Sequence, residues 1–367
     1  MDMILIFLLW FLCAEAVLTA LQLPLRKKKI KRGARIALIA VKALFAVLFA
    51  FLPMAGPVQL RIVQPFMMAM YVALLADAAA DALCGILFAL RKIERTFRVV
   101  KTVSLIAGAL FFVCGVVNMV TVTPKEHTYT SEKLTREHTL VFIADLHVGS
   151  AQPFSVTEKT IADVKALNPE ATILGGDIVD DYTTKEEMEA TFRLFGSFDT
   201  PVYYLYGNHD RQGHAEYAVG KKFTQEELEA AMTANGVIIL KDEYAELAPD
   251  LLLLGREDLT EGENRAKIET LQNPAPEKYL IVADHQPVAF KENLAAGTDL
   301  QLSGHTHAGQ LFPLGLLYPL IGGYNCGDYT EGDAIMNVSS GACGWRVPLR
   351  TEARCHYEVI RLTPEAK

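Results

Sequence analysis

Four long apolar runs fill the first third of the chain and limit what this part can fold into. Each is about 20 residues or longer, the length that an α-helix needs to cross a bilayer. A buried helical domain is the alternative interpretation, but four such runs in succession disfavour it. The sequence therefore predicts a transmembrane helical domain over residues 1–122, with spans at about 3–23, 34–56, 62–90 and 99–121.

Charged residues between these runs predict how the helices cross the membrane. The loops 26–35 and 91–101 carry seven and five Lys or Arg, whereas the turn from Pro53 to Arg61 carries one. Positive residues stay on the cytoplasmic side, so both basic loops are expected inside. The N-terminus and everything after residue 122 are then expected outside, as in a multi-pass membrane protein with an extracytoplasmic C-terminal domain. The start of the chain has no Lys or Arg and so lacks the basic region of a secretory signal.

Charge also separates the two parts of the chain. The chain has 35 basic and 43 acidic residues. Residues 1–122 hold 14 of the basic and 5 of the acidic residues, so 21 basic and 38 acidic residues remain in 123–367, a net charge of −17. A domain this acidic repels polyanions at long range. Nucleic acid is therefore not expected as a partner.

The pattern after residue 122 predicts an α/β domain. Residues 123–139 are polar and are expected to form a linker and an edge strand. From residue 140 to 367, strand-like runs first alternate with helix-like runs and then follow one another more closely, which predicts α/β with a second sheet. Strands are expected at 140–144, 171–176, 202–207, 237–240, 251–255, 279–283, 300–304 and 334–341, and helices at 155–167, 184–198 and 224–235.

Residues that can bind metals follow most of these strands. In open α/β sheets, functional groups gather just beyond the carboxyl ends of strands. Any one such residue is ordinary in a turn, but the series in this order is not. Five of the nine histidines fall in it, and its members are Asp145, His147, Asp177, Asn208, His209, Asp210, His285, His305 and His307.

The mixture of ligand types indicates the kind of metal. Carboxylates, imidazoles and an amide, with no thiolate, suit Mn, Fe or Zn. Two divalent ions about 3.5–4 Å apart can clamp the attacking and leaving oxygens of a phosphoryl group. One carboxylate then has to serve both ions, and Asp177, after the middle one of the first three strands, is the natural bridge.

The order of DxH, GDxxD, GNHD, a single His and GHxH resembles the calcineurin-like metallophosphoesterases over residues 140–363. The stretches "GHTHAGQ" (304–310) and "SSGACGWRVPLR" (339–350) are most similar to a membrane-associated bacterial branch. The resemblance implies a two-sheet β-sandwich flanked by helices. Ala308 stands where this branch often has Gly, and Asp284 stands where a small or polar residue is expected.

The same resemblance implies a role for each site residue. The first ion would be held by Asp145, His147, Asp177 and His307, and the second by Asp177, Asn208, His285 and His305. His209 would face the phosphate and stabilise or protonate the leaving oxygen, with Asp210 orienting it. Asp180 matches the family's GDxxD as a supporting or capping group, and for Asp181 a surface position fits at least as well.

Several residues keep two interpretations. Arg350 either binds the substrate or pairs structurally. Trp345 either rims the cleft or packs in the core. Four ionisable residues lie inside the apolar runs: Glu15, Lys42, Asp77 and Asp81. Such residues are costly in a membrane unless they pair. They form either a structural ion-pair network or a polar cavity for a lipid head group.

These observations favour an enzyme. We expect a membrane-anchored two-metal phosphoesterase that hydrolyses a phosphodiester or phosphomonoester by metal-activated hydroxide attack. Its location beside a bilayer favours a lipid-linked or envelope substrate. The alternative is a non-hydrolytic metal-binding membrane receptor or sensor; the complete ligand set and His209 favour the enzyme.

Overall fold

The computed structural model describes residues 2–22, 32–55, 64–89, 97–214 and 220–365. The chain divides into two compact units. The helical unit comprises Met1–Val117 with Leu311–Leu314, and the sandwich unit comprises Asn118–Gln310 with Gly315–Lys367. Most of the two basic loops, and the turn between the second and third apolar runs, lie outside the described residues.

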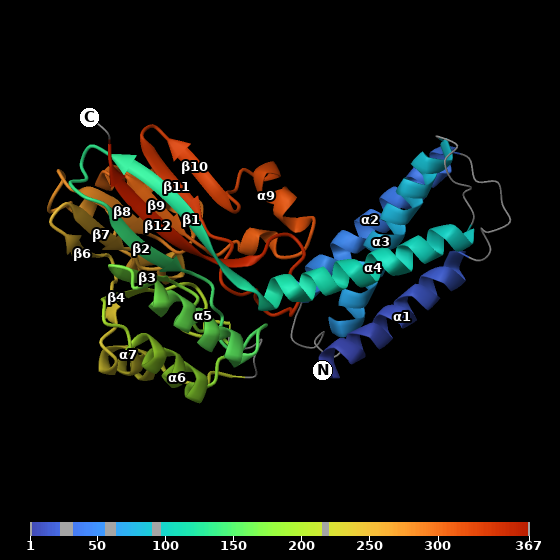
Figure 1. The fold of residues 1–367 in the computed structure, drawn as a ribbon, viewed down its shortest axis with the longest axis horizontal. Coiled ribbons are helices and arrows are strands. Elements are labelled where there is room, and N and C mark those ends of the chain that lie inside the picture. Colours follow the sequence, from blue (N-terminus) through green and yellow to red (C-terminus); the bar gives the residue numbers. More distant parts are fainter. Residues whose placement is uncertain (1, 23–31, 56–63, 90–96, 215–219, 366–367) are drawn as a thin grey trace. The chain divides into compact units, whose positions relative to one another are not determined.

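Four helices form the first part of the chain: α1 (Asp2–Gln22), α2 (Arg32–Ala55), α3 (Gln64–Ala89) and α4 (Phe97–Val120) (Figure 1). Among the described residues, three stretches are long and apolar enough to cross a membrane: Arg32–Leu52, Phe66–Leu87 and Arg98–Val120. In helix α1, the residues with described side chains give the shorter apolar stretch Leu9–Gln22. The expectation of four spans is thus reduced to three candidate membrane helices.

Charged side chains meet inside the helical unit. Lys42 Nζ lies 2.7 Å from Asp77 Oδ2 and 2.5 Å from Asp81 Oδ2. Lys101 Nζ lies 2.7 Å from Asp77 Oδ1 and 3.6 Å from Glu15 Oε2. Charges in apolar helices are costly unless they pair, so this geometry favours the structural ion-pair network, with Lys101 as an additional member.

The sandwich unit contains two six-stranded sheets, which agrees with the predicted two-sheet fold. The first has the order β1 (Val122–Ser131), β12 (Cys355–Pro364), β2 (His138–Ile143), β3 (Ala171–Gly175), β4 (Val202–Leu205) and β5 (Ile238–Ile239). The second has the order β10 (Gly327–Glu331), β11 (Ala334–Val338), β9 (Leu300–Ser303), β8 (Tyr279–Ala283), β7 (Leu251–Gly255) and β6 (Glu243–Ala248).

Alternation along β2 shows how the layers are built. Leu140 and Phe142 lie in the core between the two sheets, with Leu251 and Leu253 of β7. Val141 and Ile143 face the other way, into a core formed with the helices. These helices, grouped on one face of the first sheet in Figure 1, are α5 (Phe154–Leu167), α6 (Lys185–Phe195) and α7 (Gln225–Ala234). A strand buried on both faces reads as one continuous apolar run, which is why β2 is visible in the sequence.

Strand direction brings the ends of the central strands together. In the first sheet, β2 is parallel to β3, and β3 to β4. In the second sheet, β7, β8 and β9 are parallel in turn. The loops that leave β2, β3, β4, β8 and β9 therefore begin at the carboxyl edges of the two sheets.

Candidate active site

The loops that follow β2 and β3 are joined by main-chain hydrogen bonds. The N–H of Asp145 donates to Gly176 O at 3.0 Å, and the N–H of His147 donates to Asp177 O at 3.0 Å. Asp145, His147 and Asp177 are at most 1% exposed. The predicted convergence of one Asp and one His beyond β2 is therefore built into a buried, hydrogen-bonded pair of loops.

Backbone strain is concentrated at these residues. A positive φ is uncommon outside glycine and costs of order 1–3 kcal/mol where it is strained. Five candidate ligands nevertheless have φ between 40° and 71°: Asp145, His147, Asp177, His305 and His307. Such clustering is typical of functional sites, where the surrounding structure holds an unfavourable backbone in place. Ala308 also has a φ of 50°, which explains why glycine suits that position.

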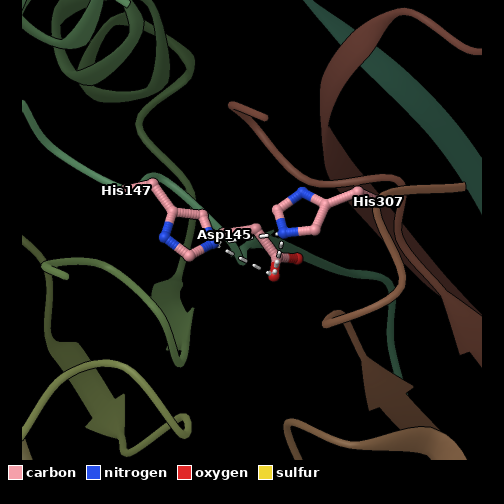
Figure 2. A group of neighbouring side chains, drawn as sticks. All are labelled: Asp145, His147 and His307. Atoms are coloured by element: carbon pink, nitrogen blue, oxygen red, sulfur yellow. Dashed lines mark hydrogen bonds and ion pairs between the residues drawn. The ribbon is translucent and has the colours of Figure 1, made fainter. Parts of the chain in front are cut away.

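The first ligand group consists of Asp145, His147 and His307, whose ligand atoms lie within 4.8 Å of one another (Figure 2). The Nε2 atoms of the two imidazoles are 3.2 Å apart. His307 Nδ1 faces the Cys343 carbonyl at 3.1 Å, and His147 Nδ1 faces an Asp180 carboxylate oxygen at 3.2 Å. Because both Nδ1 atoms face acceptors, they carry the protons, so two Nε2 lone pairs point at each other. A cation between them resolves that conflict.

The second group consists of Asp177, His285 and His305. His285 Nδ1 faces Gly175 O at 2.9 Å, and its buried Nε2 lies 3.1 Å from Asp177 Oδ2 without a hydrogen bond among the described residues. Asn208 Oδ1 joins the group at 2.9 Å from His305 Nδ1. This donor set again fits a divalent cation.

Asp177 connects the two groups. Its Oδ2 lies 3.1 Å from His285 Nε2 and 3.7 Å from His147 Nε2. Its Oδ1 accepts a hydrogen bond of 2.8 Å from the N–H of His209. The carboxylate thus stands where a bridge between two ions would have to stand.

Electrostatics suit cation binding. Burial and the nearby His285 lower the pKa of His305 to about 4, and burial together with His147 lowers the pKa of His307, so these two rings are neutral as ligands must be. Burial would lower the pKa of His285, but Asp177 raises it, so a cation has to displace a proton from this ring. Burial opposes ionisation of Asp177, but His285 and His209 outweigh it and lower the pKa of this carboxyl. Burial raises the pKa of Asp145, so a nearby cation would stabilise its ionised form.

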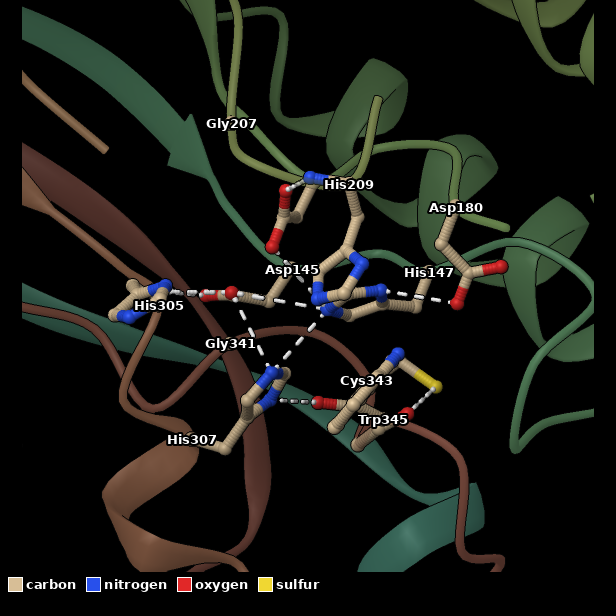
Figure 3. A network of polar contacts seen from close by, with 12 residues as sticks. Asp145, His147, Asp180, Gly207, His209, His305, His307, Gly341, Cys343 and Trp345 are labelled. Carbon is tan, nitrogen blue, oxygen red and sulfur yellow. Dashed lines mark hydrogen bonds and ion pairs between the residues drawn. The ribbon is translucent and has the colours of Figure 1, made fainter. Parts of the chain in front are cut away.

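His209 lies at the edge of the ligand groups, and Figure 3 shows it with His147, His305 and His307 around Asp145. Its ring centroid is 5.5 Å from that of His147 and 4.8 Å from that of Trp345. Burial would lower the pKa of His209, but Asp177 and Asp181 raise it to about 9, which favours the protonated form.

The structure corrects the assignment of the residue that orients His209. His209 Nδ1 lies 2.7 Å from Asp181 Oδ2, and Asp181 is fully buried rather than at the surface. Asp210 instead accepts hydrogen bonds from the main-chain N–H groups of Asp177, Ile178, Val179 and Gly207 at 2.6–3.1 Å. Asp210 therefore fixes the loop that carries Asp177, and Asp181 fixes the imidazole.

Of the two interpretations of Arg350, the structure favours the structural one, since this side chain is fully buried and bonded to main-chain carbonyls. It donates to the carbonyls of Cys343 at 2.7 Å, His307 at 3.0 Å and Ala353 at 3.1 Å, and also to Ser340 O. Cys343 O is the acceptor that faces His307 Nδ1. Arg350 therefore positions the main chain around a candidate ligand.

Two further residues support the ligand loops. Gly341 has a φ of 83°, and a Cβ there would lie 2.6 Å from Asp145 Cβ, so only glycine fits. Asp284 pairs with Arg265 through two hydrogen bonds of 3.0 and 2.6 Å and is buried behind His285. The unexpected acidic residue before His285 is thus a structural anchor.

Comparison with known proteins places part of the chain in a family. The family described as calcineurin-like phosphoesterase matches residues 138–309, which span β2 to the turn after β9. These residues belong to the calcineurin-like phosphoesterase family. An uncharacterized metallophosphoesterase of Helicobacter pylori is 29% identical over 253 residues, which are 66% of this chain and 64% of that protein.

Other relatives of this chain come from bacteria and animals. A Campylobacter jejuni metallophosphoesterase is 27% identical over 72% of this chain and 70% of its own length. A zebrafish transmembrane protein with a metallophosphoesterase domain is 28% identical over 59% of this chain and 51% of its own length. The alignment therefore spans less than two thirds of the Helicobacter and zebrafish relatives.

Proposed function

We propose that this chain is a membrane-anchored phosphoesterase with two divalent metal ions, taken from Mn, Fe and Zn. The observation that supports it best is the pair of adjoining buried ligand groups with Asp177 between them and His209 at their edge. The calcineurin-like family gives the reaction class, hydrolysis of a phosphoester.

Each residue then has a defined task. Asp145, His147, Asp177 and His307 would hold one ion, and Asp177, Asn208, His285 and His305 the other. Ions bound there lower the pKa of water, neutralise charge on the phosphoryl oxygens and so promote in-line attack at phosphorus.

His209 would act on the leaving group. Its Nδ1 faces Asp181, which leaves Nε2 to donate a proton or a hydrogen bond to the oxygen that departs from phosphorus. Asp181 keeps the ring in this tautomer and orientation. The acidic character of residues 123–367 means that attraction of a phosphoester has to come from this site and not from the surface.

Location is the second part of the proposal. The three candidate helices would anchor the chain in a membrane, and the predicted positions of the basic loops would place the sandwich unit on the extracytoplasmic side. Alkaline phosphatase fused after Lys367 would be active if this sidedness is right. A cytoplasm-dependent fluorescent reporter would be bright there if it is wrong.

Hydrolysis of bis-p-nitrophenyl phosphate by the purified full chain tests the reaction. We expect release of p-nitrophenol that requires added Mn²⁺ and stops when a chelator is added. A chain that binds Mn²⁺ but releases no p-nitrophenol from the diester or from p-nitrophenyl phosphate would favour the receptor or sensor instead.

A further inference from the structure

An uncharged apolar segment follows directly after the metal-ligand motif. Residues 311–321 read "LFPLGLLYPLI" and contain no charged side chain. Leu316, Leu317, Leu320 and Ile321 are 58%, 41%, 79% and 80% exposed, and we call these four residues the apolar rim. The other large apolar side chains exposed in the described sandwich unit are scattered in sequence, so the apolar rim is a concentration and not a chance exposure.

The apolar rim is held beside the candidate metal site by hydrogen bonds. It occupies the turns η9 (Leu314–Leu316) and α9 (Leu317–Leu320). The N–H of Gly315 donates to Glu352 Oε2 at 2.9 Å, and Asn325 Nδ2 donates to Gly315 O at 3.1 Å. A Cβ on Gly315 would lie 2.5 Å from Ala308 O, so this turn packs against the residue that follows His307.

Tyr318 shows which way the segment faces. It is half-buried, whereas its neighbours Leu317 and Pro319 are exposed. Leu317 and Leu320, on the same helical turn, are exposed. One short helical turn thus partly buries its tyrosine and presents apolar side chains to the outside.

The chain itself suggests what covers the apolar rim. Leu311–Leu314, which lead directly into it, belong to the compact unit formed by the candidate membrane helices. An uncharged cluster of Leu and Ile suits the acyl boundary of a bilayer, where apolar side chains insert among lipids. A partner protein that is recognised specifically would be expected to meet polar groups around such a patch as well.

We propose that the apolar rim inserts into the surface of the bilayer and that the phosphoester substrate is carried by a lipid, so that its head group reaches the site from the membrane. This inference rests on the proposed membrane-anchored phosphoesterase and names its substrate class. It makes the segment after His307 a membrane contact in addition to the helices.

Fluorescence quenching by brominated lipid tests the membrane contact. The probe is Leu320→Trp in the full chain with Trp10→Phe and Trp345→Phe, reconstituted in phosphatidylcholine nanodiscs with or without dibrominated acyl chains. We expect strong quenching of this tryptophan. The matched control is Leu167→Trp in the same background, because Leu167 is 44% exposed at the end of α5, and it should stay unquenched.

Two outcomes would overturn the contact. If Leu320→Trp is quenched no more than Leu167→Trp, the apolar rim is not in lipid. If the same sample self-associates with rising concentration, a second copy of the chain covers the apolar rim. Turnover of bis-p-nitrophenyl phosphate by the wild-type chain in identical discs is measured separately, so a failure of the proposed reaction is not confused with a failure of the contact.

Kinetics test the substrate class. Leu320→Ser/Ile321→Ser should leave turnover of bis-p-nitrophenyl phosphate unchanged. Turnover of hexadecyl p-nitrophenyl phosphate embedded in the discs should fall about tenfold, the factor that loss of ~1.4 kcal/mol of apolar burial produces. The control substitution Leu167→Ser should change neither rate. Equal turnover of the embedded probe by the wild type and the double variant would overturn the lipid-borne substrate.

Discussion

At the scale of single residues, His209 and Asp177 have separable tasks in the proposed site. Asp177 stands between the two ligand groups, whereas His209 touches them only through its main chain and ring edge. His209→Ala should therefore keep both metal ions and lower kcat by about 10²–10⁴-fold, the usual cost of removing a general acid. Metal analysis and steady-state kinetics on one preparation check this, and loss of an ion would show that His209 is a ligand.

Arg350 offers a second test at this scale because a substrate contact and a positioning role predict different results. Arg350→Lys removes the planar fork that donates to four carbonyls, and leaves buried acceptors without partners. We expect about 3 kcal/mol of lost stability and weaker metal binding. Thermal unfolding and metal titration provide the readouts.

The control for Arg350 is Arg354→Lys, an exposed arginine four residues later, which should change neither property. A raised KM for Arg350→Lys with unchanged unfolding temperature and unchanged metal affinity would restore the substrate-binding interpretation.

Residue motifs identified the candidate ligands but not all of their supports. The ligand types recur at fixed places after apolar strands, so Asp145, His285 and His307 were visible in the sequence. Asp181 was not, because its partner His209 lies 28 residues later and the pairing depends on how two loops fold against each other. A second acidic residue directly after GDxxD was the only available signal. Both interpretations of Arg350 stayed open because a sequence does not show burial.

At the scale of elements, the strands buried on both faces were the easiest to predict. β3 and β7 are fully buried and read as continuous apolar runs. β6 and β10 have exposed, polar faces and gave no such run. β12 lies between β1 and β2 in the first sheet, a pairing of segments more than 200 residues apart that no local pattern encodes.

The loop after β11 (Ala334–Val338) provides a prediction at the scale of elements. Gly341→Ala places a methyl group 2.6 Å from Asp145 Cβ at a φ of 83°. Because both the strain and the clash act on a ligand loop, we expect about 3 kcal/mol of destabilisation together with loss of metal from the first group. Chemical unfolding and metal content provide the measurements.

A second glycine separates strain from contact. Gly332 lies in the β10–β11 turn at a φ of 61°, and a Cβ added there has no atom within 4 Å. Gly332→Ala should therefore lower the stability only by the backbone strain, about 1 kcal/mol, and leave the metal content normal. Equal effects of the two substitutions would show that the contact with Asp145 does not matter.

At the scale of the whole molecule, a network of carboxylates and imidazoles links the two sheets. His127 of β1 lies 2.9 Å from Glu358 of β12 and 3.7 Å from Asp328 of β10. Burial alone would lower the pKa of His127, but Asp328 and Glu358 raise it from its ordinary 6.5 to about 9. The paired, charged imidazole therefore stabilises the folded sandwich unit.

The sign of the pH dependence follows from that shift. A raised folded-state pKa means that the stabilisation is fully present below pH 6.5 and is lost as the pH rises through about 9. The shift corresponds to about 3 kcal/mol, which we reduce to about 2 because Asp328 is 42% exposed. His127→Gln should lower the unfolding temperature at pH 6 and leave it nearly unchanged at pH 9.5. An equal loss at both pH values would show that charge is not involved.

The central claim is that the chain hydrolyses phosphoesters with two metal ions bridged by Asp177. The most direct measurement strips the purified full chain with a chelator, reloads it with Mn²⁺, and then records ions per chain by mass spectrometry together with p-nitrophenol release. The wild type should bind two ions and recover its rate, whereas Asp177→Asn should keep one ion or none and show no hydrolysis. An Asp177→Asn chain with two ions and a near-normal rate would contradict the bridge, and a wild-type chain with two ions and no hydrolysis would contradict the enzyme.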